Sequence, residues 1–271
     1  MTRGVVIVTG GTFGLGREIT LCLAAKGYSV VAFGLETPQV SSTAQNAIPG
    51  LRAEAEAHGL DVALLEADVS DETDVAHVLA ATLERYGRID GLVNNAAIGP
   101  LGTILDTEPD LWNRIVAVNL RGPYLMARAV IPHMAEQGGG CIVNVGSGAG
   151  WGKENMAAYA TTKGGIIALS AAMALDHFHD RIRVNTVIPG GGGIVAGMSL
   201  GRVQGDRTKL GPDAVGTVAG RVANGTDLGN AIAYLMSPEA EAVSGTIIDV
   251  GCFAHQGSST PNKRKILKEK T

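Results

Sequence analysis

Near its start the chain reads Val5-Val6-Ile7-Val8-Thr9-Gly10-Gly11-Thr12-Phe13-Gly14-Leu15-Gly16. The run Val5–Thr9 is typical of a buried strand, and the residues from Gly16 onward have the spacing of an amphipathic helix. The glycines between them allow a tight turn and bring backbone N–H groups close to the positive end of the helix. A strand, a glycine turn and a helix in this order form a binding site for a pyrophosphate. The stretch therefore predicts a dinucleotide-binding fold.

The same alternation of strand and helix continues along the chain. Apolar runs predict strands at Val5–Thr9, Ser29–Phe33, Val62–Ala67, Leu92–Asn95, Ile142–Val145, Val184–Ile188 and Thr246–Val250. Amphipathic segments predict helices near Gly16–Lys26, Thr73–Tyr86, Pro109–Gln137, Ala157–Asp176 and Thr226–Met236. Apolar strands that alternate with helices form a parallel sheet covered on both faces. We predict an α/β fold with one Rossmann-type, doubly wound parallel sheet of about seven strands.

The composition narrows the class of protein. The 271 residues carry a formal net charge of −4, which argues against a nucleic-acid-binding protein, since these normally show a basic face. No apolar run approaches the roughly 18 residues of a membrane helix, and the start of the chain lacks the pattern of a signal peptide. The three cysteines are scattered without the spacing of a metal site. We expect no metal, no membrane span and a cytoplasmic location.

We find no internal linker, so we expect one catalytic domain over residues 1–257. Within it, Gly190–Gly220 is long, polar and rich in glycine, which is typical of a substrate lid, with an exposed insertion as the alternative. Residues 258–271 form a basic C-terminal tail, expected to be a flexible, solvated extension rather than an anchor or targeting segment.

Tyr159 and Lys163 are four residues apart in the sequence Tyr-Ala-Thr-Thr-Lys. On a helix, positions i and i+4 share a face. A nearby ammonium favours the phenolate, so the tyrosine pKa is expected to fall from about 10 toward the working pH. A tyrosine in this state exchanges a proton with an alcohol oxygen. The pair therefore predicts general acid/base chemistry, the alternative being a packed tyrosine and a surface lysine.

The choice between NAD and NADP depends on the end of the second strand. An acidic residue there binds the adenosine ribose hydroxyls. The expected position is Gly34, which has no carboxylate, and Glu36 is the nearest substitute. Because a carboxylate repels a 2′-phosphate, we predict NAD over NADP. An ordinary surface role for Glu36 is the alternative.

These features together resemble the short-chain dehydrogenase/reductase family, in its shorter single-domain subgroup, from about Val5 to Gly251. The matching positions are Thr9 to Gly16, Asp68-Val69, Asn94-Asn95-Ala96-Ala97, Asn119, Ser147, Tyr159, Lys163 and Pro189-Gly190. The resemblance implies an oxidoreductase that transfers a hydride between a nicotinamide cofactor and a secondary alcohol or ketone.

The resemblance also implies roles for individual residues. Tyr159 is the expected acid/base, Lys163 its charge partner and nicotinamide-ribose ligand, Ser147 the hydrogen-bond partner of the substrate oxygen, and Asn119 the holder of a water linked to Lys163. The expected cofactor-binding residues are Gly10, Thr12, Phe13, Gly14, Leu15, Gly16, Glu36, Asp68, Val69, Asn95, Ala96, Ala97, Tyr159, Lys163, Pro189 and Gly190, with Ile188 against the nicotinamide. The expected substrate contacts are Ser147, Trp151, Met156, Tyr159, Gly191 and Met198.

Three positions depart from the family pattern. Ala97 replaces a usual glycine, Ser147 lies one residue closer to Tyr159 than is usual, and Ala196 stands near the position where a threonine often binds the nicotinamide carboxamide. Read singly, Ser147 and Asn119 also fit ordinary turn and helix-surface roles.

The sequence favours a small polar secondary alcohol, for example a polyol, sugar or cyclic alcohol, because the expected lid is polar and aromatic residues are few. The resemblance implies a homotetramer built through the two long helices at Pro109–Gln137 and Ala157–Asp176, with a dimer as the alternative, and both helices carry enough apolar and small residues to pack on two sides. A non-catalytic nucleotide-binding regulator, an NADP-dependent ketone reductase and a nucleotide-sugar epimerase or dehydratase are competing hypotheses.

Overall fold

A computed structural model describes residues 3–36, 47–190, 198, 219, 221 and 223–251. The strands are β1 (Val5–Thr9), β2 (Ser29–Gly34), β3 (Val62–Glu66), β4 (Gly91–Asn94), β5 (Gly140–Val145), β6 (Ile182–Pro189) and β7 (Ile247–Val250). The α-helices are α1 (Gly14–Ala25), α2 (Ala47–Ala57), α3 (Glu72–Tyr86), α4 (Pro109–Val116), α5 (Gly122–Glu136), α6 (Ala157–Asp176) and α8 (Gly225–Met236). A π-helical turn, η1 (Ala117–Arg121), joins α4 to α5, and the 3₁₀ turns η2 (Gly148–Trp151) and η4 (Pro238–Ala240) follow β5 and α8.

All strand pairs are parallel, and the sheet has the order β3-β2-β1-β4-β5-β6-β7. The prediction of a Rossmann-type, doubly wound sheet of seven strands is therefore confirmed. After β3 the chain returns past β1 to form β4, so the strand order reverses between the neighbouring strands β1 and β4. Ligands of such sheets bind beyond the carboxyl ends of the strands at this reversal.

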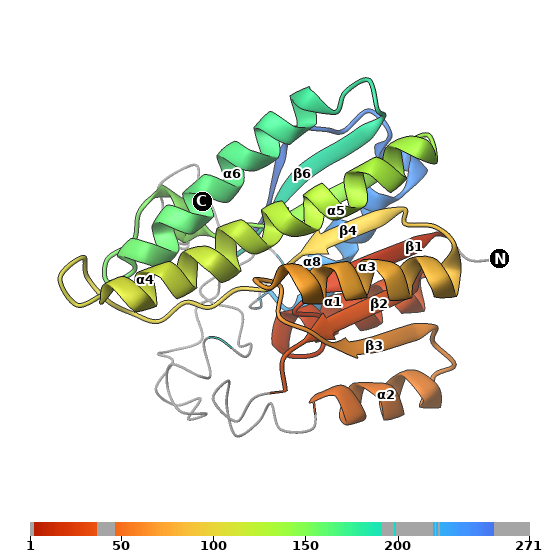
Figure 1. The fold of residues 1–271 in the computed structure, drawn as a ribbon, viewed down its shortest axis with the longest axis horizontal. Coiled ribbons are helices and arrows are strands. Elements are labelled where there is room, and N and C mark those ends of the chain that lie inside the picture. The colour runs from red at the N-terminus through yellow and green to blue at the C-terminus, as the bar shows by residue number, and fades with distance from the viewer. Residues whose placement is uncertain are drawn as a thin grey trace, which may run out of the picture.

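The helices cover both faces of the sheet. Figure 1 shows α3, α4, α5 and α6 on the near side and α1 with α8 on the far side. Strand side chains alternate between the two sides, as the period of two requires. Ile7 joins the core under α3 and α5, while its neighbours Val6 and Val8 join the core under α1 and α8.

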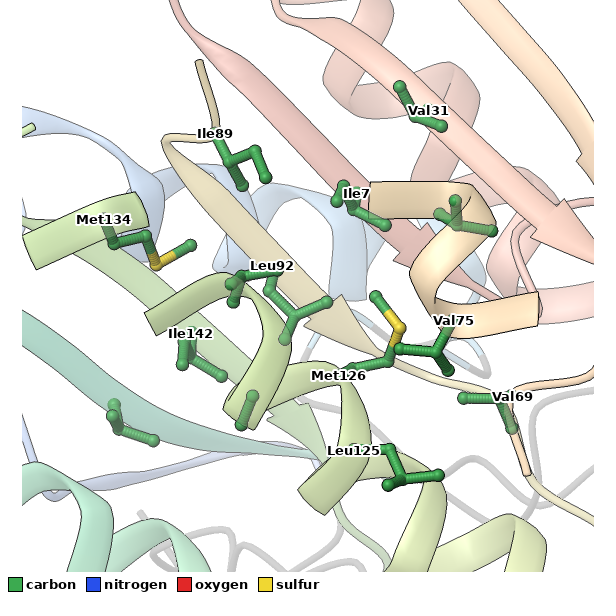
Figure 2. Close-up of a cluster of buried hydrophobic side chains, with 14 of the residues drawn as sticks. Ile7, Val31, Val69, Val75, Ile89, Leu92, Leu125, Met126, Met134 and Ile142 are labelled. Atoms are coloured by element: carbon green, nitrogen blue, oxygen red, sulfur yellow. The ribbon is translucent and has the colours of Figure 1, made fainter. Parts of the chain in front are cut away.

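The core under α5 illustrates why these strands are apolar. Figure 2 shows Leu92 and Ile142 of the sheet in one buried cluster with Met126 and Leu125 of α5. Met126, Leu92 and Ile142 are fully buried. Burying such side chains stabilises the fold by roughly 1.5–3 kcal/mol each.

Two parts of the fold differ from the sequence prediction. The helix expected at Pro109–Gln137 is two α-helices joined by η1, and α2 was not predicted. The expected lid at 190–220 lies outside the described residues except for Gly190, Met198 and Ala219, as do Gly191, Ala196 and the tail at 258–271. Within the described part, no helix combines the length and apolar character needed to cross a membrane.

Candidate active site

The glycine turn after β1 packs closely on its neighbours, where side chains would not fit. Gly10 and Gly14 have φ values of 59° and 55°, a left-handed conformation that favours glycine. A Cβ on Gly16 would overlap the carbonyl oxygen of Gly10 and the side-chain amide of Asn95. Helix α1 begins at Gly14 with no acidic residue in its first turn. Its positive N-terminal end therefore faces a cradle of bare backbone, which suits a pyrophosphate.

Asn95 fixes the end of β4 against this turn. Its side-chain Nδ2 donates to the carbonyl oxygens of Thr9 and Gly10 at 3.0 and 3.1 Å. The backbone N–H groups of Asn95 and Ala96 donate to Thr9 Oγ1 at 3.0 and 2.9 Å. Ala96 and Ala97 are half-buried beside this contact. The two strand ends on either side of the reversal in strand order are thus held together.

The outer side of the turn lies next to the ends of β2 and β3. A Cβ on Gly34 would lie 2.6 Å from Thr12 Oγ1, so a larger residue at the expected acidic position would press on the glycine turn. Glu36 Oε1 accepts a hydrogen bond of 2.6 Å from Ile48 N, at the start of α2. Its carboxylate is thereby held close to the end of β2.

Asp68 and Val69 follow β3 with different surroundings. Val69 is buried in the core, and a Cβ on Gly122 would meet its side chain at 2.9 Å. Asp68 is partly exposed. Burial disfavours the charged form of Asp68, but hydrogen bonds from Ser70 and Arg114 outweigh it and lower the pKa of this carboxyl below its usual value. The side chain of Val69 is therefore used in packing, whereas Asp68 presents a partly exposed, charged side chain.

Helix α6 brings Tyr159 and Lys163 to one face, as predicted. Both are buried, with 9% and 3% of their surfaces exposed. Lys163 Nζ donates to the carbonyl oxygen of Val145, the last residue of β5, at 2.7 Å, and lies 5.7 Å from the ring centre of Tyr159. Burial lowers the pKa of Lys163 to about 8, because the charged form loses its hydration. The lysine therefore still carries its charge at neutral pH.

The π-helical turn η1 places Asn119 in the interior. Its Oδ1 accepts from Ile98 N and its Nδ2 donates to Ile98 O, both at 2.8 Å. Nδ2 also donates to Thr162 Oγ1 at 3.2 Å, and this hydroxyl donates to the carbonyl oxygen of Tyr159 at 2.8 Å. Asn119 thus connects the loop after β4 to the turn of α6 that carries Tyr159. π-Turns inside helices occur frequently at functional sites.

Ser147 follows β5 and caps η2. Its Oγ accepts a hydrogen bond of 3.2 Å from Ala149 N. A Cβ on Gly150 would lie 3.0 to 3.1 Å from backbone atoms of Lys163 and Gly164, so this loop packs directly on the backbone of α6. Ser147 therefore belongs to a loop whose position is fixed relative to Tyr159 and Lys163.

An apolar cluster surrounds Tyr159 on the side of the expected substrate. It contains Ala149 and Met156, and Met198 packs against it. Trp151 is exposed at 44%, at the rim of the same loop. Ile188 and Pro189 are the last residues of β6 and pair with β7, Gly190 follows them, and Ile188 and Gly190 are buried. The structure thus brings Met156 and Met198 to Tyr159 and leaves Trp151 partly exposed.

Sequence reasoning missed Thr162, Gly150 and Gly164. Thr162 is fully buried and connects Asn119 to Tyr159, although a threonine inside a helix gives no local signal for such a contact. Among the described residues, no group of three His, Cys, Asp or Glu side chains is arranged to hold a metal ion.

The fold and the glycine turn define a Rossmann-type nucleotide-binding protein with an ionisable pair at the end of β5. Residues 4–199 match the model of the short chain dehydrogenase family, and the chain belongs to this family of oxidoreductases. A 2-(R)-hydroxypropyl-CoM dehydrogenase of Xanthobacter autotrophicus is 39% identical over 190 residues, which are 69% of this chain and 73% of that enzyme.

Two solved structures cover nearly the whole chain. A 3-ketoacyl-(acyl-carrier-protein) reductase from Brucella melitensis, complexed with NADH, has a TM-score of 0.76 and 31% identity, and the match covers 92% of this chain and 97% of that one. An actinorhodin polyketide ketoreductase with NADPH has a TM-score of 0.79 and 28% identity, covering 94% and 99%. The family therefore binds nicotinamide cofactors, of either kind.

Proposed function

We propose that this protein interconverts a secondary alcohol and its ketone, with Tyr159 as general acid/base and NAD as the preferred cofactor. The observation that carries the proposal is the buried arrangement of Tyr159 and Lys163 on one face of α6, next to the end of β5. A buried ammonium that is held by a carbonyl oxygen is costly, and such strained ionisable groups gather at functional sites.

The chain's own residues divide the proton chemistry between them. In oxidation, Tyr159 as phenolate takes the proton of the substrate hydroxyl, and in reduction its phenol returns a proton to the forming alkoxide. The ammonium of Lys163 favours the phenolate through its charge. Ser147 donates a hydrogen bond to the substrate oxygen and stabilises the charge that develops on it. The bound nicotinamide accepts or supplies the hydride.

Asn119 contributes by positioning. Its side-chain amide forms hydrogen bonds with Ile98 and Thr162, so it fixes the position of the loop after β4 relative to the turn of α6 that carries Tyr159. The expected role of Asn119 in holding a water linked to Lys163 stays a prediction.

The cofactor is proposed to lie across the carboxyl ends of the strands. We expect its pyrophosphate to contact the glycine turn at Gly10, Thr12, Phe13, Gly14, Leu15 and Gly16. Its adenosine is expected to contact Glu36, Asp68, Val69, Asn95, Ala96 and Ala97. Its nicotinamide half is expected to contact Tyr159, Lys163, Ile188, Pro189 and Gly190. Bare backbone at Gly10 and Gly16 and the positive end of α1 support this placement. The carboxylate of Glu36, held at the end of β2, supports NAD because it repels a 2′-phosphate.

We propose a small secondary alcohol as the substrate. The relative named 2-(R)-hydroxypropyl-CoM dehydrogenase supports a secondary alcohol group as the reacting group, and the apolar cluster of Ala149, Met156 and Met198 with Tyr159 is suited to a short alkyl group. Trp151, Ser147 and Gly191 complete the proposed substrate contacts. A polyol, a sugar and a cyclic alcohol belong to the panel that tests the proposal.

A homotetramer built through α4, α5 and α6 is also proposed, with a dimer as the alternative. Tyr124 on α5 and Leu175 on α6 are exposed at 45% and 78% in the single chain, and apolar groups of this size are commonly covered in assemblies. Light scattering in solution tests the oligomeric state. A single catalytic domain and a cytoplasmic location remain part of the same proposal.

The decisive experiment combines binding with turnover. Binding of NAD(H) and NADP(H) is measured by nicotinamide fluorescence, and turnover is measured with a panel of secondary alcohols and their ketones. We expect tighter binding of NAD(H) and alcohol-dependent formation of NADH. Tighter NADP(H) binding would favour the ketone reductase, and dinucleotide binding without turnover on any panel member would favour the non-catalytic regulator.

A further inference from the structure

Two arginines from the α4–η1 segment form hydrogen bonds with the loop that follows β3. Arg114 of α4 donates from Nη2 to Asp68 Oδ2 at 2.9 Å and from Nη1 to Ser70 Oγ at 3.2 Å. Arg121 of η1 donates from Nη1 to the carbonyl oxygen of Ser70 at 2.8 Å and also pairs with Glu72. Both arginines hold the loop, but Arg114 alone of the two contacts the carboxylate of Asp68.

The carboxylate of Asp68 is held on both of its oxygens. Oδ1 accepts from Ser70 N at 2.9 Å and from Ser70 Oγ at 2.6 Å, while Oδ2 receives Arg114. The backbone N–H of Asp68 donates to Asp74 Oδ2 at 2.7 Å. The side chain is 21% exposed, so a ligand has access to it. These contacts keep Asp68 charged and fix the plane of its carboxylate.

The strand order places Asp68 on the outer side of the glycine turn. Gly34 of β2 pairs with Glu66 of β3, and a Cβ on Gly34 would touch Thr12 in the turn. Tyr159 and Lys163 lie on the opposite side, beyond β4 and β5. A dinucleotide with its pyrophosphate at α1 and its reactive end at Tyr159 therefore extends its other base toward β3. A fixed carboxylate at that position is a strong acceptor for an exocyclic amino group.

We propose that Arg114 is a positioning residue for adenine recognition, acting by orienting the Asp68 carboxylate toward the exocyclic amino group of the base. The proposal rests on the proposed function, since it requires a dinucleotide bound in this direction.

The test compares NAD with nicotinamide hypoxanthine dinucleotide, which lacks the amino group of adenine. Hydrogen bonds to charged groups discriminate by about 10- to 100-fold, so wild-type protein is expected to bind NAD more tightly by at least about tenfold. In Arg114→Met this preference falls to within about threefold, while kcat with saturating NAD stays unchanged. Asp68→Ala abolishes the preference in the same way.

Arg121→Met is the matched control, because Arg121 donates to Ser70 in the same loop but does not contact Asp68. It is expected to keep the wild-type preference, even where affinity for both dinucleotides falls together. Arg114→Lys, which retains the charge but not the planar fork, gives an intermediate preference and serves if Arg114→Met fails to fold.

Three outcomes would overturn the proposal. An Arg114→Met protein that loses affinity for both dinucleotides equally would show a purely structural role, and equal binding of both by the wild-type protein would remove the base contact. Both results leave the proposed function standing. A wild-type protein that binds neither dinucleotide would contradict the proposed function and this inference together.

Discussion

The two ends of the proposed cofactor site are held by different kinds of interaction. At the Tyr159 end, Asn119, Thr162 and Lys163 are at most 3% exposed and are joined by hydrogen bonds to buried backbone. At the adenosine end, the side chains of Arg114 and Asp68 are 48% and 21% exposed.

This difference predicts how each end responds to mutation. Leaving a buried polar group without its partner costs about 1–3 kcal/mol and displaces its neighbours. Exposed ion pairs contribute about 0–1 kcal/mol, because water and salt screen them. Substitutions at the Tyr159 end are therefore expected to lower turnover strongly. Substitutions at the adenosine end are expected to change the preference between dinucleotides.

The largest effect is expected from Lys163→Met. The substitution removes the ammonium beside Tyr159 and the donor to Val145 O, so turnover is expected to fall by about 10²–10⁴. Steady-state kinetics on a substrate from the panel measures it. Lys26→Met, at the exposed end of α1, is the control and keeps wild-type turnover. If turnover of Lys163→Met fell by less than tenfold, Lys163 would have no part in the proton transfer.

Gly150→Ala tests whether the packing of η2 on α6 matters. The new Cβ meets backbone atoms of Lys163 and Gly164 at 3.0 to 3.1 Å, so the Ser147 loop must shift relative to Tyr159. We expect kcat to fall by about tenfold or more with little change in NAD affinity, because small misplacements of reacting groups are costly. Gly50→Ala, where a Cβ meets nothing within 4 Å, provides the control. Unchanged kcat in Gly150→Ala would show that the loop accommodates the methyl group.

Glu36→Gln probes the adenosine end. It keeps an acceptor for Ile48 N but removes the charge, so the preference for NAD over NADP is expected to fall by about five- to tenfold while kcat with NAD holds. Binding titrations with both cofactors measure the ratio. If the ratio is the same in Glu36→Gln as in wild-type protein, the carboxylate does not select the cofactor.

The smallest effect concerns stability and pH. The pKa of Lys163 is about 8 in the folded chain, below its ordinary value of 10.5, so the unfolded chain binds more protons between these pH values. Below pH 8 the cost of burying the ammonium is fully present, and it is relieved as pH rises toward 10.5. Wild-type protein is therefore expected to gain a few degrees of melting temperature relative to Lys163→Met between pH 8 and pH 10, whatever the offset caused by the lost donor to Val145 O. A difference that is constant across this range would contradict the burial of a charged Lys163.

The parts of the structure that local patterns encode were predicted from the sequence. Val5–Thr9 and Ala157–Asp176 have the predicted bounds, because apolar runs and helical periodicity act over neighbouring residues. The i, i+4 spacing likewise placed Tyr159 and Lys163 on one face. Helix α2 was missed because Pro49 and Gly50, which disfavour helix interiors, stand near its start.

Contacts between distant segments were not predictable in this way. Arg114 reaches Asp68 across 46 residues, and Asn119 reaches Thr162 across 43. The π-helical turn that buries Asn119 has no local signature in Ala117–Arg121. These features depend on how α4, η1 and α6 pack together, which periodicity within one segment does not specify.

The most direct test of the central claim is to measure NAD binding and alcohol-dependent turnover in wild-type protein and in Tyr159→Phe. The phenylalanine keeps the ring in the cluster with Ala149 and Met156 but removes the proton-carrying hydroxyl. Tyr86→Phe is the control, because the Tyr86 hydroxyl at the end of α3 donates to Asp61, away from Tyr159 in the fold. We expect Tyr159→Phe to bind NAD like the wild-type protein and to lose turnover by about 10²–10⁴. Near-normal kcat in Tyr159→Phe would contradict the assignment of Tyr159 as the general acid/base.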